Sequence, residues 1–219
     1  MKNISKEDYL SVIFKNLNFN GEIKPNIIAT KLSISNAAVT DMLKKLAKDG
    51  FVVYKRYKGI QLTDEGESYA RNMVRRHRIW EVFLNKVVGM PWDKVHDEAN
   101  RLEHSSSDDL IDRLEEMLDF PEYDPHGDPI PSKKGKLPKI KKHRPLSELK
   151  EKETSTVVRV NDFDESFLKY ISKIGIKLKE KITVNERRDF DKSMEITVKG
   201  KPWNISNKLA QNIFVEVKE

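Results

Sequence analysis

The 219-residue sequence contains no cysteine, so disulfide scaffolds, thiolate zinc sites and cysteine nucleophiles are excluded. It also lacks any apolar run near the roughly 20 residues that are needed to span a bilayer. The opening segment MKNISKEDYL has no apolar stretch of the kind that marks a signal peptide. Hydrophobic residues make up 37% of the chain and charged residues 35%, which is typical of soluble proteins. We therefore expect a cytoplasmic protein with no membrane partner.

Charge is distributed unevenly along the chain. The formal net charge is +6, but residues 71–125 carry a net charge of −5 and residues 126–152 carry +6. An acidic centre beside basic segments favours two kinds of contact, with anions at the outside and with cations at the centre. Simple solvation of a charged surface is the alternative explanation.

The N-terminal part has the pattern of helices followed by a hairpin. Ser5, with Asp8 three residues later, forms the capping pattern of a helix start, and Asp49-Gly50 is a typical helix stop. The spacing of apolar and β-branched residues predicts these elements: helices over residues 5–17, from Pro25 and over 36–48, and a two-stranded hairpin over 51–63.

The rest of the chain changes character twice. A helix from Asp64 toward Val88 and another from Pro91, divided by the serines at 105–107, precede a segment with six prolines in 25 residues. Such a segment cannot be a regular helix or a central strand, so we expect an extended connector. Short β-type segments then predict a small β-barrel, with strands at 157–160, 181–184, 195–198 and 213–217 and a helix at 164–174.

Residues 25–62 form the pattern helix–turn–helix–hairpin. A helix of this kind enters the major groove of DNA, while a basic hairpin grips the flanking phosphates. The outer face of the second helix and the hairpin tip supply the predicted DNA-contacting residues, which are Ser35, Asn36, Ala37, Ala38, Thr40, Asp41, Lys44, Arg56 and Lys58. A packing unit with no role in DNA binding is the alternative.

Four potential metal ligands share one face of a predicted helix. At 100° per residue, His96, Asn100, Glu103 and His104 fall within a stripe of about 100°. An inward-facing stripe is normally apolar, so two imidazoles, a carboxylate and an amide in that position indicate a bound cation. A hydrogen-bonded core histidine is the alternative explanation for His104.

A second set of polar residues adds to this pattern. His77 and Glu81 stand four residues apart on one helical face, and Asp8 could supply a further carboxylate. The alternatives are a surface pair for His77 and Glu81 and a capping box for Asp8.

No catalytic signature accompanies these patterns. Glu103-His104 is not the H-E-x-x-H arrangement of zinc enzymes, and neither a G-x-S-x-G elbow nor a glycine-rich phosphate loop occurs. We therefore expect no enzymatic activity and no small organic substrate.

Several segments, in order, carry a family resemblance: EDYL, SNAAVTDMLKKLAKDGFV, RRHRIWEVFL, KVHDEANRLEHSSSDDLIDRL and FPEYDPHGDPIP. With them the chain resembles the diphtheria-toxin-repressor-like, metal-dependent transcriptional regulators. The tail from LSELKEKETSTVVRV onward resembles the SH3-like barrel of long family members and of ferrous-transport accessory proteins (the FeoA type). The fold implied is mainly α with β parts: a winged helix-turn-helix, a helical dimerisation domain and a small SH3-like β-barrel.

The resemblance implies two neighbouring metal sites. The primary site would use Asp8, Asn100, Glu103 and His104, and the ancillary site would use His77, Glu81 and His96. In long members the barrel also supplies ligands, for which Asp164 or Glu165 is the candidate here. Asn100 departs from the cysteine or glutamate of relatives, so the primary site loses a thiolate or a carboxylate.

The identity of the metal is left open by the resemblance. Asp8 matches manganese-responsive relatives, although Ser11 replaces their glutamate, whereas His96 and the third domain match the iron-responsive branch. Oxygen and nitrogen ligands suit Mn²⁺ or Fe²⁺, and Zn²⁺, Co²⁺ or Ni²⁺ should substitute in vitro.

The resulting hypothesis is a metal-activated repressor of metal-uptake genes that binds palindromic double-stranded operators as a homodimer. Its expected domains are residues 1–72 (winged helix), 73–125 (metal binding and dimerisation), 126–145 (Pro/Lys-rich linker) and 146–219 (barrel). Two alternatives are a regulator whose metal site has decayed, with Asn100 as the sign, and an adaptor that does not bind DNA.

Overall fold

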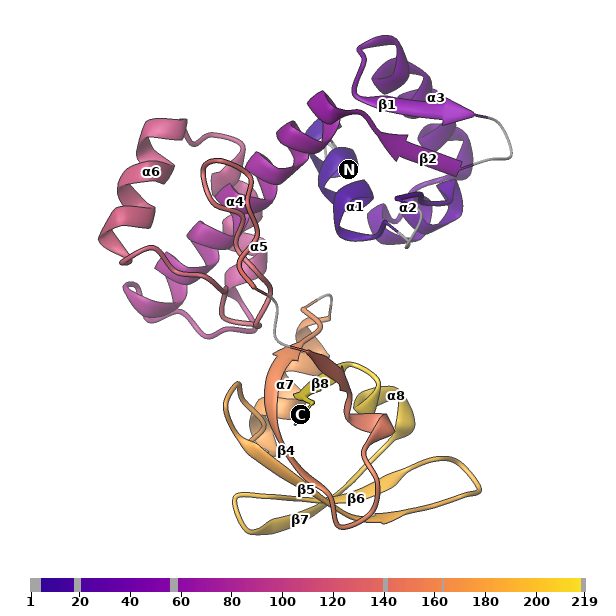
Figure 1. Cartoon of the computed structure of the whole chain (residues 1–219), viewed down its shortest axis with the longest axis vertical. Coiled ribbons are helices and arrows are strands. Elements are labelled where there is room, and N and C mark those ends of the chain that lie inside the picture. Colours follow the sequence, from indigo (N-terminus) through magenta and orange to yellow (C-terminus); the bar gives the residue numbers. More distant parts are fainter. Residues whose placement is uncertain (1–4, 18–20, 56–58, 140–141, 163, 218–219) are drawn as a thin grey trace. The chain divides into compact units, whose positions relative to one another are not determined.

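The computed structural model describes residues 5–17, 21–55, 59–139, 142–162 and 164–217. These divide into two compact units, one formed by Met1–Arg76 with Pro131–Lys136 and the other by His77–Ile130 with Leu137–Glu219. Figure 1 shows the helices and strands of each unit. Among the described residues, no helix is both long enough and apolar enough to cross a membrane.

The first unit is a helix-turn-helix with a hairpin. Its elements are α1 (Lys6–Lys15), α2 (Pro25–Leu32), α3 (Asn36–Lys48), β1 (Val52–Lys55), β2 (Gly59–Leu62) and the start of α4 (Asp64–Lys86). The two strands pair antiparallel, with Val52 opposite Leu62. Apolar side chains from the three helices and from β2 form one buried core that includes Leu10, Ile28, Leu43 and Ile60.

Capping side chains begin the helices where the sequence predicts. The N–H of Ser5 donates to Asp8 Oδ2 at 2.7 Å and the Ser5 hydroxyl accepts from Asp8, so the predicted capping box is confirmed. Ser35 caps α3 by accepting from the N–H of Ala38 at 3.2 Å. The turn before α3 passes through Ser33, whose φ of 56° lies in the left-handed region. This turn sets the direction in which α3 leaves α2.

The helical part of the second unit contains the rest of α4 with α5 (Val95–Glu103) and α6 (Asp108–Met117). The predicted helix start at Pro91 was wrong, because Lys94 donates to Pro91 in a turn and α5 begins at Val95. Ser107 caps α6 as predicted, with its hydroxyl accepting from Leu110. The buried side chains of Ile79, Val82, Ile111, Leu114 and Ile130 form the core between these elements.

The C-terminal part is a curved sheet around its own core. Its elements are β3 (His143–Pro145), a 3-10 turn (Leu146–Glu148), β4 (Thr154–Val160), α7 (Glu165–Lys173), β5 (Lys181–Arg187), β6 (Met194–Val198), β7 (Lys201–Ile205), α8 (Asn207–Ala210) and β8 (Ile213–Glu216). In the described residues the strand order is β3-β8-β4-β5-β6-β7, and all neighbours are antiparallel. Figure 1 shows the sheet wrapping around its interior.

Two strands of this sheet were not predicted, and both contain a proline. Pro145 lies in β3 and Pro202 in β7, which are the two edges of the sheet. Proline cannot donate a backbone hydrogen bond, so it is tolerated in an edge strand. In a sequence, however, a proline counts against the prediction of a strand. The barrel itself was predicted correctly from the four other strands.

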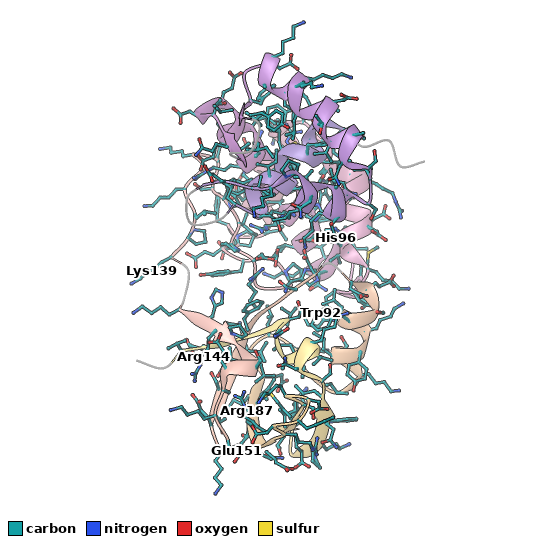
Figure 2. The ribbon with its side chains drawn as sticks, turned by 90° about the vertical axis from the view of Figure 1, so that its right-hand side faces the viewer. Trp92, His96, Lys139, Arg144, Glu151 and Arg187 are labelled. Atoms are coloured by element: carbon teal, nitrogen blue, oxygen red, sulfur yellow. The ribbon has the colours of Figure 1, made fainter. Side chains whose placement is uncertain are left out.

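Residues 124–130, which the composition placed in an extended connector, are packed tightly in the second unit. The Trp92 indole donates to Ser172 Oγ at 2.6 Å and packs against the barrel core, and Figure 2 shows its position. His126 Nε2 donates to the Trp92 carbonyl at 2.8 Å, and the His126 carbonyl accepts from Val160 of β4 at 2.9 Å. This loop therefore attaches the barrel to the helical part of the same unit.

Candidate metal centre and nucleic-acid interface

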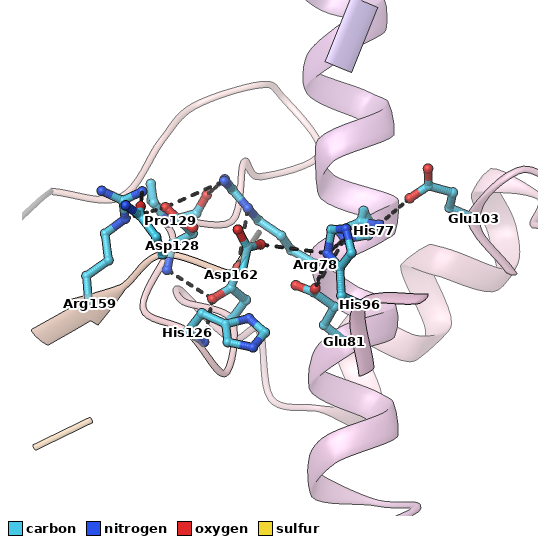
Figure 3. A network of polar contacts seen from close by, with 12 residues as sticks. His77, Arg78, Glu81, His96, Glu103, His126, Asp128, Pro129, Arg159 and Asp162 are labelled. Atoms are coloured by element: carbon cyan, nitrogen blue, oxygen red, sulfur yellow. Dashed lines mark hydrogen bonds and ion pairs between the residues drawn. The ribbon is translucent and has the colours of Figure 1, made fainter. Parts of the chain in front are cut away.

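Helices α4 and α5 bring three predicted ligands together, as Figure 3 shows. His77 Nε2 lies 3.1 Å from both Glu81 Oε1 and His96 Nδ1, and His96 Nδ1 lies 3.2 Å from the same Glu81 oxygen. An ion with bonds of about 2.1–2.2 Å and ligands at right angles holds neighbouring ligand atoms roughly 3.0–3.1 Å apart. These three atoms, which we call the α4–α5 triad, therefore have the spacing of one face of an octahedron.

The surroundings of Glu81 favour its charged form. Burial alone would raise the pKa of Glu81, but the neighbouring His77 and hydrogen bonds from His77 and His96 hold this pKa well below its usual range. His77 Nδ1 in turn lies 2.5 Å from Glu103 Oε2. A carboxylate on one imidazole nitrogen fixes the tautomer that presents the other nitrogen to a metal. Glu103 thus orients the His77 ring so that its Nε2 points toward Glu81 and His96.

A second group of potential ligands shares Glu81. One ligand atom each from Glu81, His126 and Asp162 lies within 4.8 Å of the others. Because His126 Nε2 donates to the Trp92 carbonyl, its Nδ1 is left to accept or to coordinate. Within the described part of the chain, Nδ1 of His126 and Oε2 of Glu81 are buried without a hydrogen-bond partner. We call this the barrel-side group, and its two unsatisfied atoms fit a bound cation.

The imidazole of His126 is held in an acidic environment. Burial would lower the pKa of His126, but the carboxylates of Glu81, Asp124 and Asp162 together raise it. The His126 ring also stacks on Trp92, with ring centroids 5.7 Å apart. A divalent ion would replace a proton as the positive charge among these carboxylates.

An ion-pair network fixes the loop that carries His126. Asp124 Oδ1 accepts from the N–H groups of His126 at 2.8 Å and of Asp128 at 2.9 Å. Arg78 Nε lies 3.4 Å from Asp124 Oδ2, and Arg159 of β4 donates to Asp128 at 2.7 Å. Burial, with the charges of Glu81 and Asp128, raises the pKa of Asp124 to about 7. The loop is therefore tied both to α4 and to the barrel (Figure 3).

The predicted primary ligands are drawn from both units. Asp8 belongs to the first unit, where its carboxylate closes the capping box of α1. Asn100, Glu103 and His104 belong to the second unit; Glu103 is buried, and His104 is the C-cap residue of α5. His104 Nε2 lies 3.5 Å from Glu103 Oε1. The primary site as a whole stays a prediction.

The two predicted barrel ligands have other partners. Asp164 caps α7 by accepting from the N–H groups of Ser166 and Phe167, and Glu165 pairs with Lys169 at 2.7 Å. Neither belongs to a ligand group among the described residues, whereas Asp162 does. A helix cap uses the carboxylate for backbone donors, which is why Asp164 is turned to its own helix.

The predicted DNA-contacting residues of the first unit lie on the outer face of α3. Ser35, Asn36, Ala37, Ala38, Asp41 and Lys44 are exposed, and Thr40 is half-buried. Val39, Leu43 and Leu46 cover the opposite, core-facing side of the helix. Lys44 Nζ lies 3.6 Å from Asp41 Oδ1, a surface pair that a phosphate can replace. Arg56 and Lys58 lie outside the described residues.

Three family models match successive parts of the chain. The N-terminal DNA-binding domain of iron-dependent repressors matches residues 3–60, and their metal-binding and dimerisation domain matches residues 63–132. A FeoA domain matches residues 144–217. The transcriptional regulator MntR of Lysinibacillus sphaericus is 33% identical over 121 residues, which are 55% of this chain and 86% of that protein. The chain belongs to the diphtheria-toxin-repressor-like family.

Solved structures of family members resemble nearly the whole chain. A manganese-dependent transcriptional repressor in complex with manganese is 36% identical, with a TM-score of 0.87 over 96% of this chain and 98% of that chain. ScaR with bound Cd²⁺ is 34% identical, with a TM-score of 0.83 over 97% and 99% of the two chains. The predicted fold class and the prediction of a metal-dependent transcriptional repressor are confirmed. None of these comparisons supports a regulator with a decayed metal site.

The barrel-side residues His126 and Asp162 were not predicted as ligands from the sequence of this family member. They stand 45 and 81 residues after Glu81, so helical spacing could not connect them. One signal was present, because the segment FPEYDPHGDPIP alternates prolines with Asp124, His126 and Asp128. Polar side chains that an ordered, proline-rich loop holds in place are typical of a binding site rather than of a mobile connector.

Proposed function

We propose that this family member is a cytoplasmic, homodimeric repressor that is activated by Mn²⁺ or Fe²⁺ and binds palindromic operators of metal-uptake genes. The α4–α5 triad carries this proposal, since three buried or half-buried ligand atoms at octahedral spacing share a chain with a winged helix. The relatives named MntR and the manganese complex support manganese as one physiological metal.

Two groups of residues would hold the ions. Asp8, Asn100, Glu103 and His104 form the proposed primary site. A second ion would take the α4–α5 triad, with His126 and Asp162 as the barrel-side ligands in place of Asp164 and Glu165. This second assignment rests on the shared Glu81 and on the unsatisfied Nδ1 of His126.

The donor atoms favour hard to borderline divalent ions. Carboxylate, amide and imidazole ligands suit Mn²⁺ and Fe²⁺, and the sequence offers no thiolate. By the Irving–Williams order Co²⁺, Ni²⁺ and Zn²⁺ bind such ligands at least as tightly. The ion that acts in the cell is therefore selected by coordination geometry and metal availability as well as by affinity.

The dimer would form through the helical part of the second unit. Val82, Ile111 and Leu114 of this part are buried in the chain's own core, so they are not available for an interface with a second copy. The interface would instead use five exposed apolar side chains from this part of the chain: Val87, Val88, Leu110, Met117 and Phe120. Burying them against a second copy removes apolar surface that water would otherwise cover.

Metal would act by selecting one arrangement of the chain. Bound ions restrain the winged-helix unit relative to the dimerisation helices, so that two recognition helices fit successive major grooves. The ion must bind the DNA-competent arrangement more tightly than the free one, or it shifts nothing. A coupling of about 1–3 kcal/mol is typical of such systems. We retain the domain limits 1–72, 73–125, 126–145 and 146–219 as part of this proposal.

Selection of binding sites from a pool of random duplexes tests the proposal. We expect Mn²⁺ or Fe²⁺, but not chelator, to enrich a two-fold symmetric sequence whose half-sites lie one helical turn apart. Sedimentation of the metal-loaded protein should give a dimer. Enrichment of an asymmetric site by a monomer, or equal enrichment in chelator, would contradict it.

A further inference from the structure

We propose that the α4–α5 triad, when it holds Fe²⁺, directs hydrogen peroxide onto its own ligands and oxidises the imidazole of His96. The chain would then respond to peroxide as well as to metal. This inference rests on the proposed function only in that a divalent ion must occupy the triad. It adds a redox activity that metal-dependent DNA binding does not require.

The composition and geometry of the triad point to this chemistry. Two imidazole nitrogens and one carboxylate oxygen lie 3.1–3.2 Å from one another and so cover a single face of an octahedral ion. Two histidines and one carboxylate on one face are the arrangement that leaves iron(II) with open positions for oxygen chemistry. With His126 and Asp162 as the further ligands of this ion, one position of an octahedral ion would stay open for peroxide.

Solvent reaches the triad at one of its three members. The side chain of His96 is 38% exposed, whereas those of His77 and Glu81 are 6% and 0% exposed. A small neutral oxidant such as peroxide therefore arrives beside His96. The other two ligands are buried, so His96 is the triad ligand whose ring peroxide reaches first.

The sequence offers no competing thiol. Cysteine is ordinarily the residue that peroxide oxidises first, and the chain contains none. Met90, in the cluster of Leu84, Val95 and Ala99, is a side chain that can take up oxygen instead. Oxidation of His96 rather than of methionine therefore depends on the iron being held at the imidazole itself.

The reaction balances with peroxide as the only oxidant. An iron(II) ion held by His77, Glu81 and His96 would supply the electron that breaks the O–O bond of H₂O₂ and would take an electron back when the ring is oxidised. One oxygen of H₂O₂ would bond to C2 of the His96 ring in place of the C2 hydrogen, and the other oxygen would leave with that hydrogen as water. The net change converts histidine and H₂O₂ to 2-oxo-histidine and water, and the iron ends as Fe²⁺.

The product no longer serves as a ligand. In the 2-oxo ring both nitrogens carry hydrogen and neither presents a lone pair to the ion, so the triad loses one of its three donors. Loss of an outer partner of a metal ligand already lowers affinity by about 10–100-fold, and loss of the ligand itself should lower it at least as much. Peroxide would therefore release the ion from this site.

Peptide mass spectrometry tests the inference. Anaerobic full-length protein is loaded with Fe²⁺, its bound iron is measured, and one equivalent of H₂O₂ is added. We expect most of the peptide that contains His96 to gain one oxygen, about 16 Da. Protein loaded with Mn²⁺ or Zn²⁺ should show none, and the peptide that contains His143 serves as an internal control in every sample.

Glu81→Gln supplies the matched variant, because it removes the charged ligand and keeps the side-chain shape. Oxidation of His96 should be lost in Glu81→Gln. A second test does not depend on the folding of this variant: Zn²⁺ added to the wild-type protein before iron should prevent the oxidation of His96. Mn²⁺-dependent DNA binding is measured on the same preparation. Three results would overturn the inference: unmodified His96 in iron-loaded protein, failure of iron to bind, or equal oxidation of His96 with Mn²⁺. If Mn²⁺-dependent DNA binding is intact in the same preparation, the proposed function still stands.

Discussion

His77 Nδ1 lies 2.5 Å from Glu103 Oε2, so a residue of the predicted primary site directly orients a ligand of the α4–α5 triad. With its Nδ1 donating to Glu103, His77 turns Nε2 toward Glu81 and His96. The two proposed sites are therefore connected through one hydrogen bond. Loss of Glu103 from the primary site should also lower the metal affinity of the triad.

Glu103→Ala should impair both sites, whereas His104→Ala should impair only the primary one. Removal of the carboxylate costs a primary ligand and also releases the His77 ring, which should weaken the triad by about 10–100-fold. Equilibrium dialysis with Mn²⁺ measures this: His104→Ala should lose about one ion per chain, and Glu103→Ala should also weaken the second. Identical isotherms for the two variants would show that the His77–Glu103 contact has no role.

Asp162→Asn should weaken metal binding, whereas Asp164→Asn should not. Asp162 belongs to the barrel-side group, and loss of its charge should reduce affinity at least tenfold, about 1.4 kcal/mol. Asparagine at position 164 still caps α7, so this variant removes a nearby carboxylate without destabilising the helix. Calorimetric titration with Mn²⁺ in the His104→Ala background compares the two. The reverse order would restore Asp164 as the barrel ligand.

The free energy of unfolding of the metal-free protein should fall as the pH rises from about 4 to about 7. Burial, with neighbouring carboxylates, raises the pKa of Asp124 from 3.8 to about 7, so over this range the folded chain holds a proton that the unfolded chain has released. The stability contributed by this proton is complete below the unfolded pKa and is lost through the folded pKa, with a slope of at most about 1.4 kcal/mol per pH unit.

Asp124→Asn should flatten this slope, because the amide oxygen still accepts from His126 and Asp128 but does not titrate. Urea unfolding at several pH values in the presence of chelator gives the comparison. A variant whose pH dependence equals that of the wild type would show that Asp124 is ionised throughout the range.

Lys44→Ala should lower DNA affinity and flatten its salt dependence. Each phosphate contact that is lost removes about one unit from the slope of log K against log salt, and Lys44 is exposed on the outer face of α3. Lys177→Ala removes an exposed lysine from the barrel and is the control. An unchanged slope for Lys44→Ala would remove this residue from the interface.

Gly127→Ala should destabilise the second unit more than Gly89→Ala does. Both glycines have positive φ, 92° and 76°, so both variants carry backbone strain of about 1–2 kcal/mol. A Cβ at Gly127 would also meet the carbonyl oxygen of Val158 at 2.2 Å, whereas one at Gly89 meets nothing within 4 Å. Thermal unfolding should show a further loss of about 1–3 kcal/mol for Gly127→Ala. Equal melting temperatures would mean that the loop moves freely from the barrel.

Local patterns in the sequence predicted the features that depend on neighbouring residues. The capping box of Ser5 and Asp8, the start of α3 at Asn36 and the pairing of His77 with Glu81 all follow from spacings of three or four residues. The central helix pattern also placed Glu103 and His96 on the side that faces other ligands. These are the ranges over which helical geometry determines which side chains meet.

Contacts between distant segments could not be predicted in the same way. Glu81 meets His126 and Asp162 only because Trp92 and Arg159 hold the 124–130 loop and the barrel against the helical part of the unit. The prolines of that loop indicated a connector, and those in β3 and β7 concealed two edge strands. A proline in the sequence shows that one backbone hydrogen-bond donor is missing, but it does not show how deeply its segment is buried.

The most direct test of the account is fluorescence anisotropy of a labelled operator duplex, titrated anaerobically with protein in chelator, in Mn²⁺ or in Fe²⁺. An unrelated duplex serves as the control for selectivity. We expect selective binding that is about 5–150-fold tighter with either metal than with chelator. Equal affinity for the operator in chelator and in metal would contradict it, because the ligand groups around Glu81 and Glu103 would then have no part in DNA binding.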